Sequence, residues 1–448
     1  MPDRTSQIDR RTFLRNATLG ATTAGIAGLA GCTGDGDDGG GGGDGGGDGG
    51  GGGSDGGDGG SDGGGGGSDG GDGGGGGGSL SLKVGVLVPL SGAYSPLGAD
   101  ARAGIEVAGQ HADSDYDDLS VDLVFKDSQL AADVGLRRAQ ELVEQENVDA
   151  LIVGDGTPVV NAVAQYAGQQ EIPNVATISA LEKTTMSDCY PYTFRTSTHS
   201  YQNMKPTAEW TTENLGTTIA TWGADYSWGR ESVGNFVEVA ENNGAEIVEQ
   251  VWPDLGATDY SSQIQKVSAS GADFVMIRAG GADMINAYKQ INSFGLGEEM
   301  DVVGIASAAE ARGAGEAALG YYGNTPYYFG LDTEANTRFV QDYRAQTDGS
   351  IPSTYSNSSY TGAKVLFEAA LQGSTEGAAM RDALEGLTVT TPLGEQEVRA
   401  CDHQIEGPQW MSRFVEDTDG DLPVGLEFLN KSEPGTNSRP CSDIKCNY

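Results

Sequence analysis

Hydrophobic residues along most of the chain follow two alternating patterns. From Leu82 onward, short runs of apolar and β-branched residues alternate with segments whose apolar residues recur at helical spacing. Strands that alternate with helices in this way are typical of parallel sheets covered by helices. The pattern therefore predicts an α/β fold. In the first series the predicted strands are 83–88, 121–126, 148–153 and 174–178, and the predicted helices are 99–111, 131–146 and 158–169.

A second series of the same kind begins after Arg195. Its predicted strands are 218–222, 246–251, 274–277 and 302–305, and its predicted helices are 205–214, 231–242, 260–269 and 284–294. Helices at 334–346 and 358–370 are then expected to return to the first lobe, and segments 395–399 and 409–415 are expected to pair as strands. A chain of 448 residues is longer than one hydrophobic core ordinarily accommodates, so we expect two lobes. The expected lobes are 82–198 with 331–390 and 199–330 with 391–430, before a cysteine-containing tail at 431–448.

The first 32 residues have the features of an export signal. Arg10 and Arg11 form a twin-arginine pattern, a weakly apolar stretch follows at 17–30, and a small-residue box precedes Cys32. That stretch is too short and too rich in Gly and Thr to span a bilayer. The segment predicts a lipoprotein signal peptide of the twin-arginine route, with lipid on Cys32 and the mature protein anchored to the membrane outside the cytoplasm.

Residues 33–81 consist almost wholly of Gly, Asp and Ser, and this composition predicts a disordered linker. The whole chain has 65 acidic and 26 basic residues, a formal net charge of -39. A charge of that sign repels phosphate backbones, so binding of nucleic acid is excluded. Abundant carboxylates and few lysines also resemble the surfaces of salt-adapted, haloarchaeal proteins, in which high salt screens the repulsion.

The chain has five cysteines. Cys189, Cys401, Cys441 and Cys446 remain after Cys32, and outside the cell they allow two disulfides in three connectivities. We expect the local pair Cys441–Cys446, while free buried thiols at Cys189 and Cys401 are the alternative. The three histidines are scattered and no metal-binding motif occurs, so we predict neither a metal site nor a cofactor.

A series of short motifs resembles the branched-chain amino acid binding family of ABC transporters. The motifs appear in the family's order and cover about residues 82–415: KVGVLVPLSG at 83–92, Gly98, Asp127, DALIVG at 149–154, Ile172-Pro173, Phe194-Arg195, Trp228-Gly229 and ADFV at 272–275. The resemblance implies the periplasmic-binding-protein type I fold, two Rossmann-like lobes joined by three crossovers. It also implies capture of a small polar solute, such as a branched-chain amino acid or a related amino acid or amide, for an ABC permease and its ATPase. We expect a monomer.

Ligands of open parallel sheets bind beyond the carboxyl ends of the strands, so the loops after each strand supply the candidates. In the first lobe these loops carry polar or small residues that suit a carboxylate or carbonyl group. An ordinary turn at 91–94, an N-cap at Thr157 and a capping box from Ser179 to Glu182 are the structural alternatives. The resemblance places the ligand's main polar group near Thr157 and Ser179. The candidates are Ser91, Tyr94, Gly156, Thr157, Thr177, Ser179 and Ala180.

In the second lobe the candidates are Tyr226, Trp228, Gly280 and Ser307. Trp228 matches the position of the family's ligand-facing aromatic residue, with core packing as the alternative. Ala306 stands where the resemblance places the glutamate that pairs with a ligand ammonium group. Asp225, Asp283 and Glu310 are the acids that could replace it, since a buried ammonium group without a partner is costly. Amides and urea-like solutes therefore stay open beside amino acids.

Two other classes of function were weighed against transport. An exported hydrolase is disfavoured because no nucleophile, base and orienting group occur together at the strand ends, and we expect no enzyme activity. The GxSxG match at 52–56 lies in the Gly-rich linker without a flanking strand or helix. A ligand-sensing receptor subunit of the same fold is the closer alternative.

Overall fold

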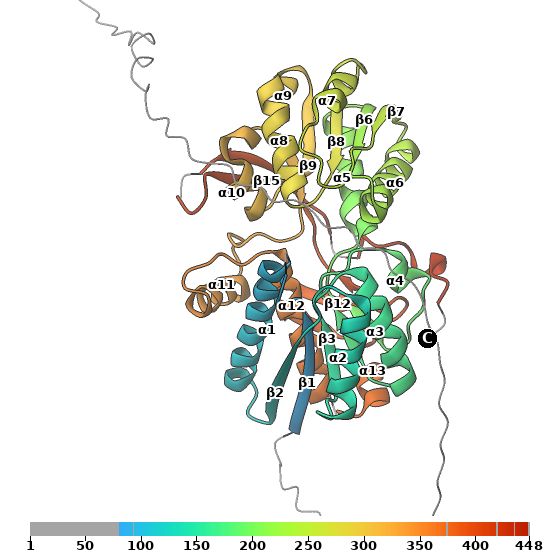
Figure 1. Ribbon diagram of the computed structural model, residues 1–448, viewed down its shortest axis with the longest axis vertical. Coiled ribbons are helices and arrows are strands. Elements are labelled where there is room, and N and C mark those ends of the chain that lie inside the picture. Colours follow the sequence, from blue (N-terminus) through green and yellow to red (C-terminus); the bar gives the residue numbers. More distant parts are fainter. Residues whose placement is uncertain (1–79, 93, 373–374, 418–419, 434, 447–448) are drawn as a thin grey trace, which may run out of the picture. The chain divides into compact units, whose positions relative to one another are not determined.

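The computed structural model describes residues 80–92, 94–372, 375–417, 420–433 and 435–446 (Figure 1). All of these lie in the unit that runs from Gly74 to Tyr448. The predicted signal peptide, its lipidation site Cys32 and the linker up to residue 79 lie outside the described residues. Within those residues, no helix is both long and apolar enough to cross a membrane.

The first lobe is built on a parallel five-stranded sheet in the order β2-β1-β3-β4-β5. Its strands are β1 (Leu80–Val88), β2 (Leu119–Asp127), β3 (Ala150–Val153), β4 (Asn174–Ala176) and β5 (Thr193–Arg195). The helices of its first pass are α1 (Ser95–Asp115), α2 (Ala132–Glu144), α3 (Thr157–Gln170) and α4 (Lys183–Met186). The helices α11 (Glu334–Gln346), α12 (Thr354–Leu371) and α13 (Gly377–Leu384) return to it later in the chain (Figure 1).

The second lobe has a seven-stranded sheet in the order β15-β14-β10-β9-β8-β6-β7. Its strands are β6 (Thr218–Gly223), β7 (Glu246–Val251), β8 (Phe274–Arg278), β9 (Asp301–Ile305), β10 (Tyr322–Thr325), β14 (Trp410–Glu416) and β15 (Val424–Lys431), of which the last two are antiparallel additions. Its helices are α5 (Ser200–Asn214), α6 (Ser227–Asn242), α7 (Ser261–Ser268), α8 (Ala282–Phe294), α9 (Leu296–Glu299), α10 (Ala308–Ala314) and the 3-10 turn η1 (Gly315–Ala318). The α/β fold with two lobes is confirmed.

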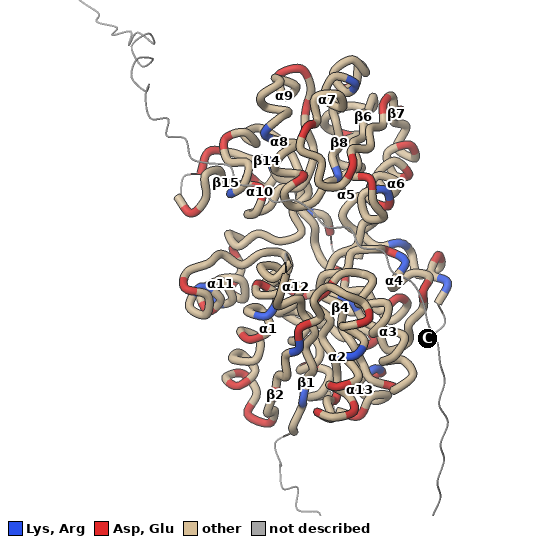
Figure 2. Tube along the Cα trace, viewed as in Figure 1, with Lys and Arg blue, Asp and Glu red and all other residues tan. Residues whose placement is uncertain are grey.

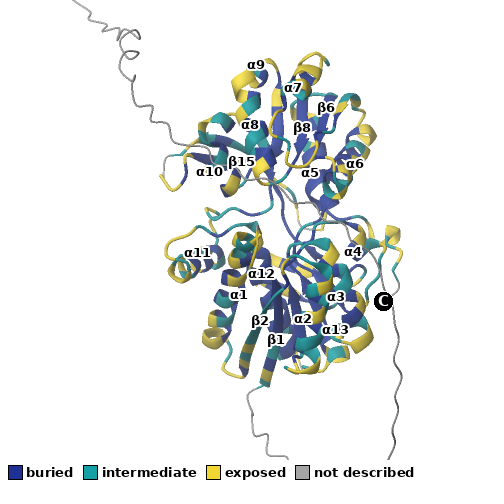
Figure 3. Cartoon of the chain, in the orientation of Figure 1, coloured by how far each residue is buried: buried dark blue, intermediate teal, exposed yellow. Residues whose placement is uncertain are grey.

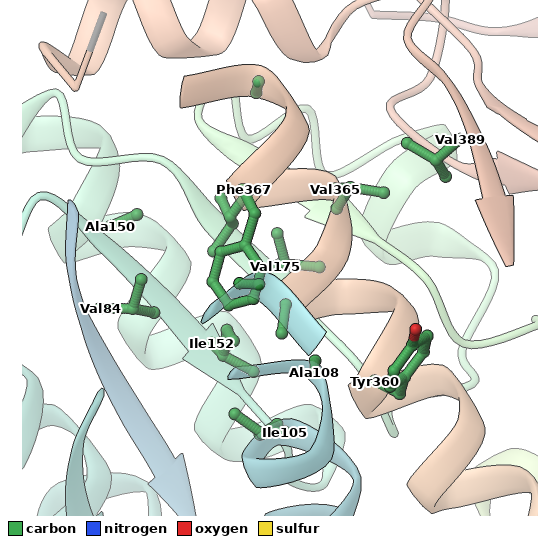
Figure 4. Close-up of a cluster of buried hydrophobic side chains, with 14 of the residues drawn as sticks. Val84, Ile105, Ala108, Ala150, Ile152, Val175, Tyr360, Val365, Phe367 and Val389 are labelled. Atoms are coloured by element: carbon green, nitrogen blue, oxygen red, sulfur yellow. The ribbon is translucent and has the colours of Figure 1, made fainter. Parts of the chain in front are cut away.

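Alternating residues of each central strand face opposite layers of helices, as the two-residue period of a strand requires. In β1, Val84 and Val86 join the core formed with α1 and α12, whereas Leu87 packs into a second core with α2 and α3. Figure 4 shows the first of these cores, where Phe367 of α12 lies close to Ile152 and Val175 of the sheet and Val365 points toward Val389. The central strands are therefore buried on both faces, whereas the edge strands β2, β7 and β15 and the helices carry exposed residues (Figure 3).

The strand pairing expected near the end of the chain is wrong. Segment 395–399 corresponds to β12 (Gly394–Val398), which pairs with β11 (Thr388–Thr391) and β13 (Ile405–Glu406) in a small antiparallel sheet. Segment 409–415 corresponds to β14, which pairs with β10 and β15 instead. The side chains of Val398 and Ile405 pack into the core of the first lobe, so residues 391–406 belong there and not to the second lobe. Alternation along a strand shows which face is apolar but does not show which strand lies beside it.

Three short segments join the lobes, as the fold prediction expects. They are residues 196–199 between β5 and α5, 326–333 between β10 and α11, and 407–409 between β13 and β14. Acidic residues lie along the helices and loops of both lobes (Figure 2).

The disulfide pairing predicted for the tail is also wrong. Cys446 is bonded to Cys189 and Cys441 to Cys401, so the pair Cys441–Cys446 does not form and neither Cys189 nor Cys401 is a free thiol. The Cα–Cα distances of 5.1 and 5.7 Å are ordinary for disulfides. Each tail cysteine lies beside a first-lobe loop that is distant in sequence, 257 residues away for Cys446 and 40 for Cys441. Sequence spacing alone does not reveal such neighbours.

The tail (residues 432–446) is a fourth connection between the lobes. It leaves the second lobe at the end of β15, and its disulfides hold it to the first lobe. Arg439 links both lobes, because its Nε donates to Glu182 Oε1 of the first lobe at 2.6 Å and its two terminal nitrogens donate to the Glu238 carboxylate of α6 at 2.8 and 2.9 Å. Its guanidinium also lies 3.9 Å from the ring centroid of Tyr201 in α5.

Gly104→Ala is expected to lower the free energy of unfolding by about 1–3 kcal/mol because α1 and α12 approach closely at this glycine. A Cβ at Gly104 would lie 2.2 Å from the carbonyl oxygen of Ser356, so the helices would have to separate. Gly234→Ala is the matched control, since a Cβ there meets nothing within 4 Å and a helix-interior alanine gains about 0.5–1 kcal/mol over glycine. Urea denaturation of both variants checks this, and equal effects would contradict the close approach.

Candidate functional site

A cavity of about 540 Å³ lies where the strand ends of the two lobes face each other. This volume is within the range of small-molecule sites. Its wall consists of loops that follow β3, β4, β6, β8 and β9, together with residues from the lobe connections and the start of α12. The cavity thus lies beyond the carboxyl ends of the parallel strands, where ligands of such sheets bind. The sequence-predicted residues that it brings together in the wall are Gly156, Thr157, Ser179, Ala180, Tyr226, Trp228, Gly280 and Ser307.

The first-lobe wall presents a pair of hydroxyl groups. Thr157 Oγ1 and Ser179 Oγ are 2.8 Å apart, and Thr157 is the first residue of α3. The N-cap of α3 is Gly156 and not Thr157, so the capping alternative for Thr157 is wrong. The alternative of a capping box from Ser179 is also wrong, because Glu182 is the N-cap of α4 and has no side-chain cap. Both hydroxyls are thus available to exchange hydrogen bonds with a bound molecule.

Three of the predicted first-lobe residues lie outside the cavity wall. Thr177 is fully buried, and its hydroxyl is 2.8 Å from that of Ser359 in α12, where it joins α12 to the sheet. Ser91 and Tyr94 lie in the loop after β1 and are exposed, Tyr94 to 53 %.

The second-lobe wall is aromatic and carries a buried cation. The rings of Tyr226 and Trp228 have centroids 6.0 Å apart, and the guanidinium of Arg278 lies 4.8 Å from the Trp228 centroid. Arg278 is 2 % exposed, and its Nη1 donates to Asn324 Oδ1 at 2.8 Å. Burial lowers the pKa of Arg278 to about 10, so the guanidinium still carries its charge at neutral pH. Sequence analysis missed both Arg278 and Asn324.

Of the three acids weighed as replacements for the glutamate missing at Ala306, Glu310 lines the cavity. It is 4 % exposed and accepts a hydrogen bond from the Ser307 hydroxyl, while burial raises the pKa of its carboxyl. Asp225 instead pairs with Arg230 at 2.6 Å, and Asp283 accepts from the Gly256 amide at 2.9 Å. The wall therefore combines a cation, an acid, three aromatic rings and several hydroxyl groups. It offers places to hold polar and apolar parts of one small molecule.

Comparisons with known proteins agree with this geometry. The sequence model described as "Periplasmic binding protein" matches residues 81–420. A curated relative, the Leu/Ile/Val-binding protein homolog 6 of Brucella melitensis, is 26 % identical over 353 residues, which are 76 % of this chain and 89 % of the relative.

Two solved structures are similar over nearly their whole length. An ABC transporter substrate-binding protein from Sphaerobacter thermophilus has a TM-score of 0.72 and 26 % identity and covers 79 % of this chain and 98 % of its own. An ABC transporter solute-binding protein from Rhodopseudomonas palustris, solved in complex with 4-hydroxybenzoate, has a TM-score of 0.70 and 22 % identity, with 79 % and 97 % covered.

Proposed function

Because this chain belongs to the periplasmic binding protein family, we propose that it captures a small solute outside the cytoplasm and delivers it to an ABC permease and its ATPase. The chain is a solute-binding protein of the ABC transporter type, like its relatives. The observation that carries the proposal is the cavity between the strand ends of two hinged lobes, since closure of such lobes around a ligand is a common form of capture.

The proposed solutes are small molecules that combine a polar group with an apolar body. One relative is named for leucine, isoleucine and valine, and one structural neighbour was solved with 4-hydroxybenzoate. In the proposed complex, the hydroxyls of Thr157 and Ser179 bind a polar group of the solute, and the rings of Tyr226 and Trp228 cover its apolar surface. Gly156, Ala180, Gly280 and Ser307 also line the cavity.

We also propose that the protein is a monomer anchored through lipid on Cys32 after twin-arginine export. The sequence of the first 32 residues supports this part of the proposal. Mass spectrometry of the mature N-terminus tests it, because an unmodified cysteine or an uncleaved signal would contradict lipidation.

A solute that binds the native protein is expected to raise its melting temperature. Purified protein in high salt is screened against amino acids, amides and aromatic acids. With a solute that binds, Thr157→Val and Trp228→Ala are each expected to raise the Kd by about tenfold or more, through the loss of a hydrogen-bonding hydroxyl and of an aromatic contact surface.

Thr212→Val is the matched control. The Thr212 hydroxyl donates to the backbone of its own helix α5, and the residue does not line the cavity. Its Kd is expected to match that of the wild type. Unchanged affinity in both Thr157→Val and Trp228→Ala would show that the solute binds elsewhere.

A further inference from the structure

Arg278 is a buried cation in the cavity wall that forms no ion pair with any of the described residues. It is the last residue of β8 and follows four buried apolar residues, so the strand holds it at the base of the second-lobe wall. In the described part of the chain, no carboxylate forms an ion pair with it, and its Nε has no hydrogen-bond partner. Burying a charge without a counter-charge is costly, and the fold retains this arrangement at a ligand cavity.

A guanidinium has five N–H donors in a planar fork that matches a carboxylate. At Arg278, one of these donors is bound, by Asn324. The Cζ of Arg278 lies 4.8 Å from the centroid of the Trp228 ring, so this ring also contacts the guanidinium. The acid of the wall, Glu310, accepts a hydrogen bond from Ser307 and attracts Arg278 electrostatically, but the two side chains form no ion pair.

We infer that the solute is a small carboxylate whose acid group binds Arg278 in the second lobe and whose flat, unsaturated body packs against Trp228 and Tyr226. Its far end then reaches the Thr157 and Ser179 hydroxyls, which bind a neutral polar group such as a hydroxyl. This orientation is opposite to the one that the sequence resemblance implies, in which the first lobe binds the main polar group. The inference rests on the proposed function and specifies the class and orientation of the solute.

Matched acid and amide pairs test the inference. The probes are 4-hydroxybenzoate with 4-hydroxybenzamide, phenylacetate with phenylacetamide, and L-leucine with L-leucinamide, each titrated by calorimetry in high salt. An acid of an aromatic pair is expected to bind about 100-fold more tightly than its amide, because the amide cannot make the charged two-bond contact. Arg278→Met is expected to remove this preference, and Arg278→Lys to retain part of it, because lysine keeps the charge but not the fork.

Arg230→Met is the matched control. Arg230 also lies over a tryptophan, 4.6 Å from the Trp252 ring centroid, but it is exposed and outside the cavity wall. The Arg230→Met variant is expected to prefer each aromatic acid over its amide as strongly as the wild type does. An aromatic amide that binds as tightly as its acid, or an acid preference that survives Arg278→Met, overturns the inference. Binding of uncharged or cationic solutes alone also overturns it and leaves the proposed function standing, whereas the absence of binding by any small solute overturns the proposed function.

Discussion

Arg195→Met is expected to lower the free energy of unfolding by about 3–5 kcal/mol, because this side chain holds three segments of the first lobe together beside the hinge. Arg195 is 1 % exposed at the end of β5. Its Nε donates to Gln404 Oε1 at 2.5 Å and its Nη2 to Thr185 Oγ1 at 2.5 Å, while Nη1 donates to the carbonyl of Leu181. Methionine fills a similar volume and makes none of these bonds, so the buried acceptors lose their donor.

Urea denaturation monitored by circular dichroism measures the loss. Arg137→Met in α2 is the matched control, since Arg137 is 61 % exposed and solvent screens its ion pair with Asp133, so its loss is expected to change the stability little. Arg195→Met is also expected to weaken solute binding, because Leu181 lines the cavity. A stability loss no greater than that of the control would show that the hinge does not depend on this network.

Removal of the tail disulfides is expected to have the second large effect. Each bond closes a long loop, with sequence separations of 257 and 40 residues, and a disulfide of this kind contributes about 2–4 kcal/mol, mainly by restricting the unfolded chain. We expect a free energy of unfolding that is lower by about 2–4 kcal/mol in each of the two double variants, Cys189→Ala/Cys446→Ala and Cys401→Ala/Cys441→Ala.

The same denaturation experiment with a reducing agent supplies the control. The wild type under reducing conditions is expected to lose the stability contributed by both bonds, while a variant lacking all four cysteines is expected to be insensitive to the reductant. A wild type whose stability does not change on reduction, with complete reduction verified by thiol titration, would contradict a stabilising role for the tail.

The hydrophobic pattern predicted the α/β elements of both lobes because strands buried between helices require continuous apolar runs, and Val84 to Val88 is such a run. The predicted strand ends also indicated which loops line the cavity, because the loops after parallel strands meet at one edge of the sheet. It did not predict β12 beside β11 or Cys446 beside Cys189, because those neighbours are set by the path of distant segments.

Arg278 shows the same limit within the cavity. Its signal was in the sequence, since an arginine directly after four apolar strand residues is unusual for a buried position. However, sequence alone does not show whether such an arginine meets a carboxylate of the protein. In the folded protein it contacts Asn324 and Trp228, and this environment is what makes the arginine a candidate anion site.

The tail also bears on what solute capture costs. A molecule that must swing its halves together loses freedom of movement on binding, and this loss is subtracted from the affinity. Here the tail continues from the second lobe and is held to the first lobe by two disulfides, and Arg439 contacts both lobes. Any movement of the halves around a solute must therefore take place with the tail attached to both of them.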